Sequence, residues 1–360
     1  MYVKELKINN YRNYKNQKIN FDKGLNVIYG GNAQGKTNMV EAIYLCSIGK
    51  SFKSAKDSVM INFDSDQSDI GVKVSKTEGD IDIEMTLTKN HKKQIKVNGG
   101  YLTRLSDILG NLVTVFFSPD DLKLIKEAPG DRRKFLDISI SQLSKRYVYI
   151  LSRYQQILTE RNNLLKSKNG TEYIKDQIDV WNHQLASTGS DIIIQRLRFV
   201  KILNEYAKKI HLYLTDNTEN LIVEYQGISD KEEEIESLLY NALTKDFEKD
   251  VMQGYTGIGP HRDDLKLVVN GLDVKTYASQ GQQRSVALSL KFAEKEILAN
   301  KLGEYPITIL DDVFSELDEN RNKRILELLS KGQTFVTTTN RCNVGKQIKI
   351  LNGEVATEVA

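Results

Sequence analysis

Cysteine, proline and long hydrophobic runs are all scarce in this chain of 360 residues. The two cysteines, Cys46 and Cys342, lie far apart in the sequence, which excludes a cysteine-based metal site and fits a reducing compartment. No apolar run approaches the roughly 20 residues that a membrane helix needs, and the polar N-terminus is unlike a signal peptide. We therefore expect a cytoplasmic protein that needs no membrane partner.

A large excess of either charge is also missing. The formal net charge is +3, which by itself is too weak to indicate a nucleic-acid partner. With 40% hydrophobic and 28% charged residues, the chain has the composition of an ordinary globular protein. Its length allows two or three domains.

A segment near the N-terminus has the spacing of a phosphate-binding loop. It lies between Leu25–Tyr29, a β-branched run that predicts a buried strand, and residues 39–47, which have helical spacing. Glycines at such a turn let backbone amides close around a phosphate at a helix N-terminus. Lys36 can reach the β- and γ-phosphates, and the Thr37 hydroxyl can ligate Mg²⁺. The predicted ATP-binding residues are Gly30, Gly31, Asn32, Ala33, Gln34, Gly35, Lys36, Thr37 and Asn38.

Hydrophobic periodicity divides the chain into three segments. Residues 136–254 have helical spacing, which predicts an antiparallel hairpin of helices with its turn at Asn169-Gly170 and a third helix over 232–252. Residues 255–360 have α/β character and end in an Asn352-Gly353 turn. Residues 1–135 are strand-rich, with a hairpin turn at Asn98-Gly99 and alternating runs at 3–8, 18–21, 70–74, 81–87 and 95–97.

Two carboxylates follow an apolar strand in the C-terminal segment. Residues 307–310 predict a buried strand that ends in Asp311-Asp312. A carboxylate at a strand end beside the phosphate loop is what Mg²⁺ coordination needs, so we assign Asp311 to the metal. Asp312 is placed to polarise the attacking water; the alternative is that it caps a helix starting near Ser315.

A third element resembles the signature motif of ABC-type ATPases, in which a helix N-terminus caps the γ-phosphate bound by a different subunit. Its residues are Ser279, Gln280, Gly281, Gln282 and Gln283. The stretch from Ser315 to Asp318 resembles the D-loop of those ATPases, and residues 335–339 resemble their switch strand. Thr339 takes the place of the usual histidine, and Asp312 stands where many relatives have glutamate. Both departures predict slow hydrolysis.

Several stretches, in order along the chain, resemble the RecF family of DNA replication and repair ATPases, which are related to SMC proteins. They are LKINNYRNY, GKTN, FSPDDLKLIKEAPGDRRKFLD, TGIGPHRDDL and SQGQQRS followed by ILDDVFSELD. The resemblance implies an α/β fold, with an ABC/SMC-type P-loop ATPase head assembled from both chain ends and an inserted helical arm domain. Residues 1–135 and 255–360 would form the head, and residues 136–254 the arm.

The resemblance also implies a function. It predicts ATP and Mg²⁺ as cofactors, a weak DNA-stimulated ATPase, and an ATP-dependent head-to-head homodimer that binds DNA without sequence specificity. RecO and RecR would be partners in loading recombinase at gaps and in SOS induction. Arg12 becomes a candidate nucleotide contact, although an exposed arginine after a strand is the simpler interpretation.

Charge placement offers a test of DNA binding. Residues 132–168 contain nine Lys/Arg and two acids, a net +7, whereas residues 169–255 contain nine basic and sixteen acidic residues, a net −7. A basic helix is typical of a contact with the phosphate backbone, and it nominates Lys145, Arg146 and Arg153. Alternatively, these cations pair with the acidic helices packed against them.

Two other classes share some of these motifs. The ATPase subunit of an ABC transporter has the loop, signature and metal strand, but lacks a helical arm of about 120 residues and usually keeps the switch histidine. A binding module that uses ATP as a switch, with negligible turnover, is the other alternative. Residues His261 to Asp264 match the RecF family closely, and we interpret them as a turn started by Pro260 with a paired Arg and Asp.

Overall fold

The computed structural model describes residues 1–54, 56–167, 170–313, 319–342 and 344–356. It divides into two compact units. The head unit comprises residues 1–121, 213–217 and 287–360, and the arm unit comprises residues 122–212 and 218–286. The arm unit therefore takes residues on both sides of the expected range 136–254, because flanking segments pair with each other: Arg132 forms an ion pair with Asp264 at 2.6 Å.

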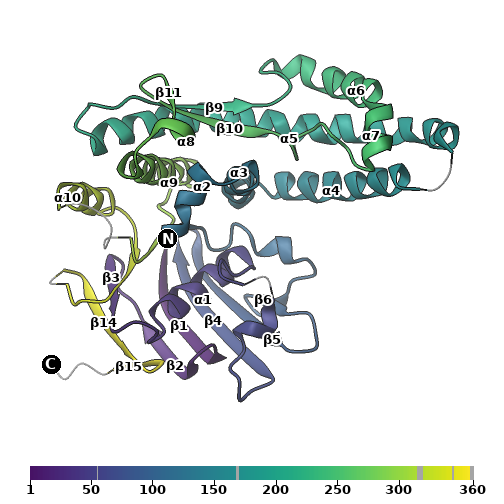
Figure 1. Cartoon of the computed structure of the whole chain (residues 1–360). Coiled ribbons are helices and arrows are strands. Elements are labelled where there is room, and N and C mark those ends of the chain that lie inside the picture. Colours follow the sequence, from purple (N-terminus) through teal and green to yellow (C-terminus); the bar gives the residue numbers. More distant parts are fainter. Residues whose placement is uncertain (55, 168–169, 314–318, 343, 357–360) are drawn as a thin grey trace. The chain divides into compact units, whose positions relative to one another are not determined.

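The head unit is built on two six-stranded sheets (Figure 1). The first is antiparallel, in the order β2 (Tyr14–Asn20), β1 (Tyr2–Tyr11), β4 (Gln67–Lys76), β5 (Gly79–Thr88), β6 (Gln94–Val97) and β7 (Gly100–Tyr101). The second is mostly parallel, in the order β15 (Glu354–Ala356), β14 (Lys346–Leu351), β3 (Leu25–Tyr29), β13 (Thr334–Thr338), β12 (Ile307–Asp311) and β8 (Thr114–Phe117). The predicted strands are confirmed, and so is the Asn98-Gly99 hairpin, where both residues have positive φ.

Helix α1 (Lys36–Ile48) lies in the core of the head unit (Figure 1). Every residue from Met39 to Ser47 is buried, so the helix is covered on all sides rather than along one stripe. It packs against strands of both sheets, including β4 and β13. Gly49 ends the helix in the left-handed conformation, φ 78°, with its N–H donated to the carbonyl of Leu45. The helix that follows the phosphate loop is therefore fixed by the core of the unit.

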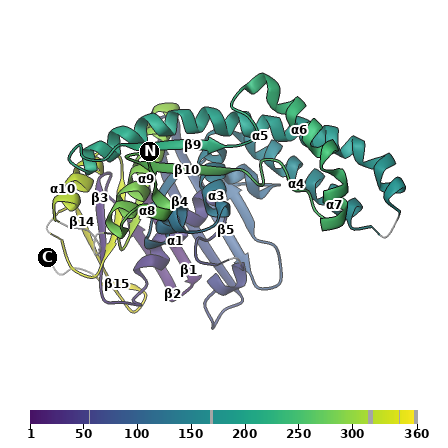
Figure 2. The same ribbon diagram turned by 45° about the horizontal axis from the view of Figure 1, so that its top comes forward.

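The arm unit combines helices with a small sheet, which the sequence did not predict. Its helices are α2 (Lys123–Lys126), α3 (Pro129–Leu143), α4 (Lys145–Leu165), α5 (Thr171–Leu214), α6 (Ile235–Lys245), α7 (Phe247–Gln253) and α8 (Val274–Tyr277). Strands β9 (Leu221–Gln226), β10 (Asp264–Val269) and β11 (Leu272–Asp273) form the sheet, and β9 and β10 run alongside α5 (Figures 1 and 2). The last two residues of α5, 213 and 214, belong to the head unit. Helix α9 (Gln280–Leu302) begins in the arm unit and belongs to the head unit from Ala287 onward.

The helices of the arm differ in part from those predicted from the sequence. The third helix over 232–252 is wrong as a single element, because the chain breaks at Asp246 into α6 and α7 after a short 3-10 turn at Glu232–Glu234. The hairpin of α4 and α5 is confirmed, while Asn169 of its turn lies outside the described residues. Among the helices that the structure describes, none is long and apolar enough to cross a membrane.

Arg161 of α4 is the polar centre of the arm unit. Its side chain is fully buried and forms an ion pair with Asp250, Nη1 to Oδ2 at 2.7 Å. The guanidinium also donates to Asn182 Oδ1 at 2.9 Å and to Thr256 Oγ1 at 2.8 Å. One side chain therefore connects α4, α5, α7 and the chain after α7.

The segment His261 to Asp264 is a second set of paired groups in the arm. His261 Nε2 lies 3.1 Å from the carbonyl of Thr256, and Nδ1 lies 2.7 Å from the Tyr154 hydroxyl. Burial lowers the pKa of His261 to about 4, so the ring is neutral at physiological pH and donates through Nε2. Tyr225 donates to the carboxylate of Asp263. The expected turn is confirmed, with the N–H of Arg262 donated to the carbonyl of Gly259 at 2.8 Å. The expected pairing differs: the Arg262 guanidinium donates to the Thr256 carbonyl at 3.3 Å, and Asp264 pairs with Arg132.

We expect the substitution Arg161→Met to destabilise the arm unit by about 3–5 kcal/mol, because it leaves the buried Asp250 carboxylate without its cation. Arg146→Met on the same helix is the matched control: its exposed pair with Asp191 is 3.9 Å long, so the loss should stay within about 1 kcal/mol. Urea unfolding followed by the fluorescence of the single tryptophan, Trp181 of α5, measures both changes. Equal losses in the two variants would contradict the assigned role of Arg161.

Candidate nucleotide-binding site

The candidate site forms at the carboxyl edge of the parallel sheet. Strand β13 lies between β3 and β12, and its register pairs Thr337 with Ile28 on one side and with Asp311 on the other. Because parallel strands end at the same edge, the loop after β3 and the carboxylate at the end of β12 meet there. The sequence expectation that the two halves of the site come together is confirmed.

Asp311 is the point of contact between those halves. Its Oδ1 atom accepts a hydrogen bond from the Thr37 hydroxyl at 2.9 Å, 274 positions away in sequence, and another from the Thr337 hydroxyl at 2.7 Å. A carboxylate beside a hydroxyl is the oxygen donor set that Mg²⁺ accepts, so Thr37 and Asp311 fit that ion. In the part of the chain that the structure describes, no group of three or more His, Cys, Asp or Glu could hold a metal. Phosphate and water oxygens would have to complete such a site.

The phosphate loop is held by bonds to its carbonyls. The Gln34 carbonyl accepts from Asn13 Nδ2 at 2.9 Å and from the N–H of Gly353 at 3.0 Å, and the Gly35 carbonyl accepts from the Tyr14 hydroxyl at 2.9 Å. In a trans peptide the carbonyl and the following N–H point in opposite directions. The N–H groups of Gly35 and Lys36 are therefore turned away from these partners, as an anion-binding loop requires.

Glycine is required at the start of the loop. Gly30 has φ 152°, and a Cβ atom there would lie 2.4 Å from the carbonyl oxygen of Ile350. Strand β14, at the C-terminal end of the chain, therefore passes too close for any side chain at this position. The same end of the chain supplies Gly353 to the Gln34 carbonyl, a contact that the sequence did not reveal.

Lys36 lies over its own loop. Its Nζ atom donates to the carbonyls of Gly30 and Gly31 at 2.7 and 2.8 Å. Burial lowers the pKa of the Lys36 ammonium, and the negative charges of Asp312 and Asp311 partly oppose that change. These carbonyls satisfy the ammonium until a more highly charged acceptor, such as a phosphate, replaces them.

A cavity of about 280 Å³ opens beside these groups. Most of the predicted nucleotide residues line it, together with Thr339. Lys53 and Thr337, which are not among the predicted ATP-binding residues, line it too. The lining residues are Asn32, Ala33, Gln34, Gly35, Lys36, Thr37, Asn38, Lys53, Asp312, Thr337 and Thr339.

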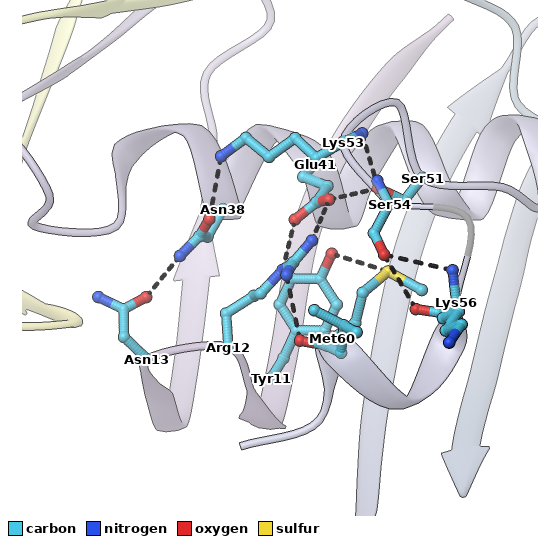
Figure 3. A network of polar contacts seen from close by, with 11 residues as sticks. Tyr11, Arg12, Asn13, Asn38, Glu41, Ser51, Lys53, Ser54, Lys56 and Met60 are labelled. Carbon is cyan, nitrogen blue, oxygen red and sulfur yellow. Dashed lines mark hydrogen bonds and ion pairs between the residues drawn. The ribbon is translucent and has the colours of Figure 1, made fainter. Parts of the chain in front are cut away.

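Arg12 makes its contacts with helix α1 (Figure 3). Its guanidinium binds both carboxylate oxygens of Glu41, at 3.0 and 2.7 Å, and also donates to the carbonyl of Val59 at 3.1 Å. Glu41 is fully buried, so this bidentate pair satisfies a charge that would otherwise be costly. The contact of Arg12 with nucleotide stays a prediction.

The remaining predicted residues of the head divide into two groups. Asp312 reaches the cavity, and its φ of 54° differs from the extended conformation typical of a helix N-cap, which argues against the alternative of a cap. Its N–H donates to the Thr337 hydroxyl at 3.1 Å. Ser315 and Asp318, assigned to the D-loop, lie outside the described residues, and α10 (Glu319–Leu328) follows them.

The signature residues belong to the arm unit, where they begin helix α9. Ser279 and Gln282 form a reciprocal cap: the N–H of Ser279 donates to Gln282 Oε1 at 2.9 Å, and the N–H of Gln282 donates to Ser279 Oγ at 3.3 Å. Gln282 also donates to Glu219 Oε1 at 3.0 Å, and Glu219 contacts the buried His211 of α5 at 3.1 Å. The predicted helix N-terminus is therefore confirmed, and its contact with a partner's nucleotide stays a prediction.

The candidate DNA contacts Lys145, Arg146 and Arg153 lie on α4 and are exposed. The charge count that nominated them was too high, because Arg132 and Arg161 are buried in ion pairs with acids of the arm. For Arg132 and Arg161, the alternative interpretation is therefore confirmed: each cation pairs with an acid packed against it.

The chain matches the family model described as "RecF/RecN/SMC N terminal domain" over residues 2–354. It is 48% identical to the "DNA replication and repair protein RecF" of Alkaliphilus oremlandii (strain OhILAs), a match that covers 94% of this chain and 93% of the relative. A solved structure described as "the recombination mediator protein RecF-ATP in RecFOR pathway" is 41% identical, has a TM-score of 0.91, and covers 99% of this chain and 98% of its own.

A more distant match shows the fold alone. An Smc head bound to the C-terminal winged-helix domain of ScpA is 18% identical, with a TM-score of 0.59, and covers 98% of this chain and 94% of its own. The head fold expected from both chain ends is thus shared with SMC proteins. The identity and coverage of the RecF relatives, together with the family match over nearly the whole length, show that this chain belongs to the RecF family of DNA replication and repair proteins.

Proposed function

We propose that the protein binds ATP with Mg²⁺ at the edge of the parallel sheet, hydrolyses it slowly, and dimerises head to head on DNA when ATP is bound. The observation that carries the nucleotide site is the hydrogen bond from Thr37 of the phosphate loop to Asp311 at the end of β12. A relative of nearly equal length is described with ATP, which supports the same ligand here.

Each residue of the site has its own role in hydrolysis. Lys36 exchanges the carbonyls of Gly30 and Gly31 for the β- and γ-phosphate oxygens, while the loop N–H groups surround the β-phosphate. Mg²⁺, held by Thr37 and Asp311, would neutralise charge that develops on the phosphates. Asp312 orients the attacking water. With aspartate here and Thr339 in place of an imidazole, the water is held less firmly, so turnover is slow and ATP acts largely as a switch.

The wider role follows from the family. We propose that the protein works in the cytoplasm on duplex or gapped DNA without reading sequence, with RecO and RecR as partners in recombinase loading and SOS induction. The name of the pathway in the description of the RecF-ATP relative supports those partners. The exposed cations of α4 support a contact with the DNA backbone.

Substitution of Lys36 tests the nucleotide site. Lys36→Ala should abolish ATP binding and, with it, dimerisation, because the phosphates lose their main cation. Lys36→Arg should bind ATP but hydrolyse it poorly, since the larger guanidinium displaces the γ-phosphate. Titration calorimetry with ATP and light scattering with and without nucleotide measure both effects. ATP affinity at the wild-type level in Lys36→Ala would refute the assignment.

Charge reversal on α4 tests the DNA surface. Changing Lys145, Arg146 and Arg153 together to Glu should weaken duplex binding and lower its salt dependence, while ATP affinity stays the same. The matched control reverses three exposed lysines of α5, namely Lys201, Lys208 and Lys209. Fluorescence anisotropy over a salt series measures the slopes. Equal losses in both triple variants would show that only total charge matters and that α4 is not the surface.

A mixing experiment tests whether the site is completed by a second subunit. Ser279→Arg should bind ATP as a monomer but fail to dimerise, because a bulky cation replaces the cap of the partner's γ-phosphate. Asp312→Asn should accumulate the ATP-bound dimer, since it keeps the interface and loses the group that orients water. A heterodimer of one Ser279→Arg chain and one Lys36→Ala chain has one intact composite site and one site with both defects. Mixing the two variants should therefore restore ATP-dependent dimer formation. Absence of heterodimers, with both proteins folded, would overturn the composite site.

A further inference from the structure

Lys53 reaches the nucleotide cavity from the segment that follows helix α1. Its Nζ atom donates to Asn38 Oδ1 at 3.2 Å, and Asn38 Nδ2 donates in turn to Asn13 Oδ1 at 2.9 Å (Figure 3). Asn13 holds the Gln34 carbonyl of the phosphate loop. The second ammonium at the cavity is therefore connected to the loop through two amide side chains.

The path of the chain makes this placement demanding. Helix α1 ends at Ile48, whereas Asn38 lies near its start, about 15 Å away at a rise of 1.5 Å per residue. Four peptide units separate Gly49 from Lys53 and span at most about 14 Å when fully extended. The segment runs back along the helix with bends at residues 49, 50, 52 and 53, and the long side chain of Lys53 covers the remaining distance to Asn38.

Two contacts hold this returning segment. Phe52 stacks on Phe116 with ring centroids 4.0 Å apart. The Ser51 hydroxyl donates to Glu41 Oε1 at 2.5 Å and accepts from the N–H groups of Lys53 and Ser54 at 2.9 and 3.0 Å (Figure 3). The hydroxyl thus joins a buried carboxylate of α1 to the backbone of the residue that carries the ammonium.

We propose that Ser51 and Glu41 are positioning residues that hold Lys53 at the nucleotide phosphates. This inference rests on the proposed ATP site. Glu41 lies one turn beyond Thr37 on the same helix. Helix α1 therefore holds both the end of the phosphate loop and, through Glu41, the segment of Lys53. The bond to Arg12 fixes the Glu41 carboxylate from the opposite side, which keeps its Oε1 directed at Ser51.

Ser51 offers the cleaner test, because Ser51→Ala leaves Glu41 paired with Arg12 and creates no unpaired buried charge. We expect Lys53→Met to weaken ATP binding about tenfold, the size expected for the loss of one charge-assisted hydrogen bond. Ser51→Ala should weaken it several-fold, and Ser51→Thr, which keeps the hydroxyl, should restore most of the affinity. Ser54→Ala is the matched control, since, within the described residues, the Ser54 hydroxyl makes its two hydrogen bonds with the backbone of Lys56.

The double variant decides whether Ser51 acts through Lys53. If it does, Ser51→Ala should have no further effect on ATP affinity in a Lys53→Met background. A purely structural role would lower affinity by the same factor in both backgrounds, and that result would overturn the inference, as would wild-type affinity in Lys53→Met. Should Ser51→Ala fail to fold, Ser51→Cys replaces it. Lys36→Ala, measured alongside, separates the two proposals: ATP binding that survives it refutes the site itself.

Discussion

The carboxylate of Asp311 is the constraint on which the rest of the head depends. One of its oxygens accepts from Thr37, which follows β3, and from Thr337 of β13. Because β13 lies between β3 and β12, these groups can meet only when C-terminal strands insert beside an N-terminal one. Neither end of the chain can build the site alone. Most of the chain between these ends, residues 122–212 and 218–286, forms a separate compact unit.

Within that unit, buried arginines take the place of part of an apolar core. Arg161 and Arg196 are nearly or fully buried, and each binds an acid and several neutral acceptors from other elements. Such pairs add little net stability compared with well-packed apolar groups, but their geometry admits only one arrangement of partners. Arg196 donates to the carbonyl of Pro260, so the turn before His261 is fixed by α5. These arginines therefore specify how α4, α5 and the loop after α7 pack.

The sequence predicted those features that depend on neighbours along the chain or on a common sheet edge. The strand, glycine-rich loop and helix around Lys36, and the strand ending at Asp311, are of this kind. It could not predict contacts between distant side chains and backbone. Lys53 was not among the predicted nucleotide contacts because nothing local shows that the chain returns along α1. Arg161 was counted with the basic residues of the arm because its partner Asp250 is 89 positions away. Strand β9 was missed because its partner β10 lies beyond the helices.

The way the phosphate loop is held bears on what can distinguish one nucleotide from another. Its carbonyls are already bonded to Asn13, Gly353 and Tyr14, so binding does not have to order the loop first. In the proposed site, the loop N–H groups would surround the phosphates that ATP and ADP share and would bind both. A preference for ATP would then come from the cations that extend past the loop, Lys36 and Lys53, and, in the proposed dimer, from the helix start of a second chain. Because Lys53 belongs to the segment that returns along α1, such discrimination between nucleotides would depend on residues outside the phosphate loop itself.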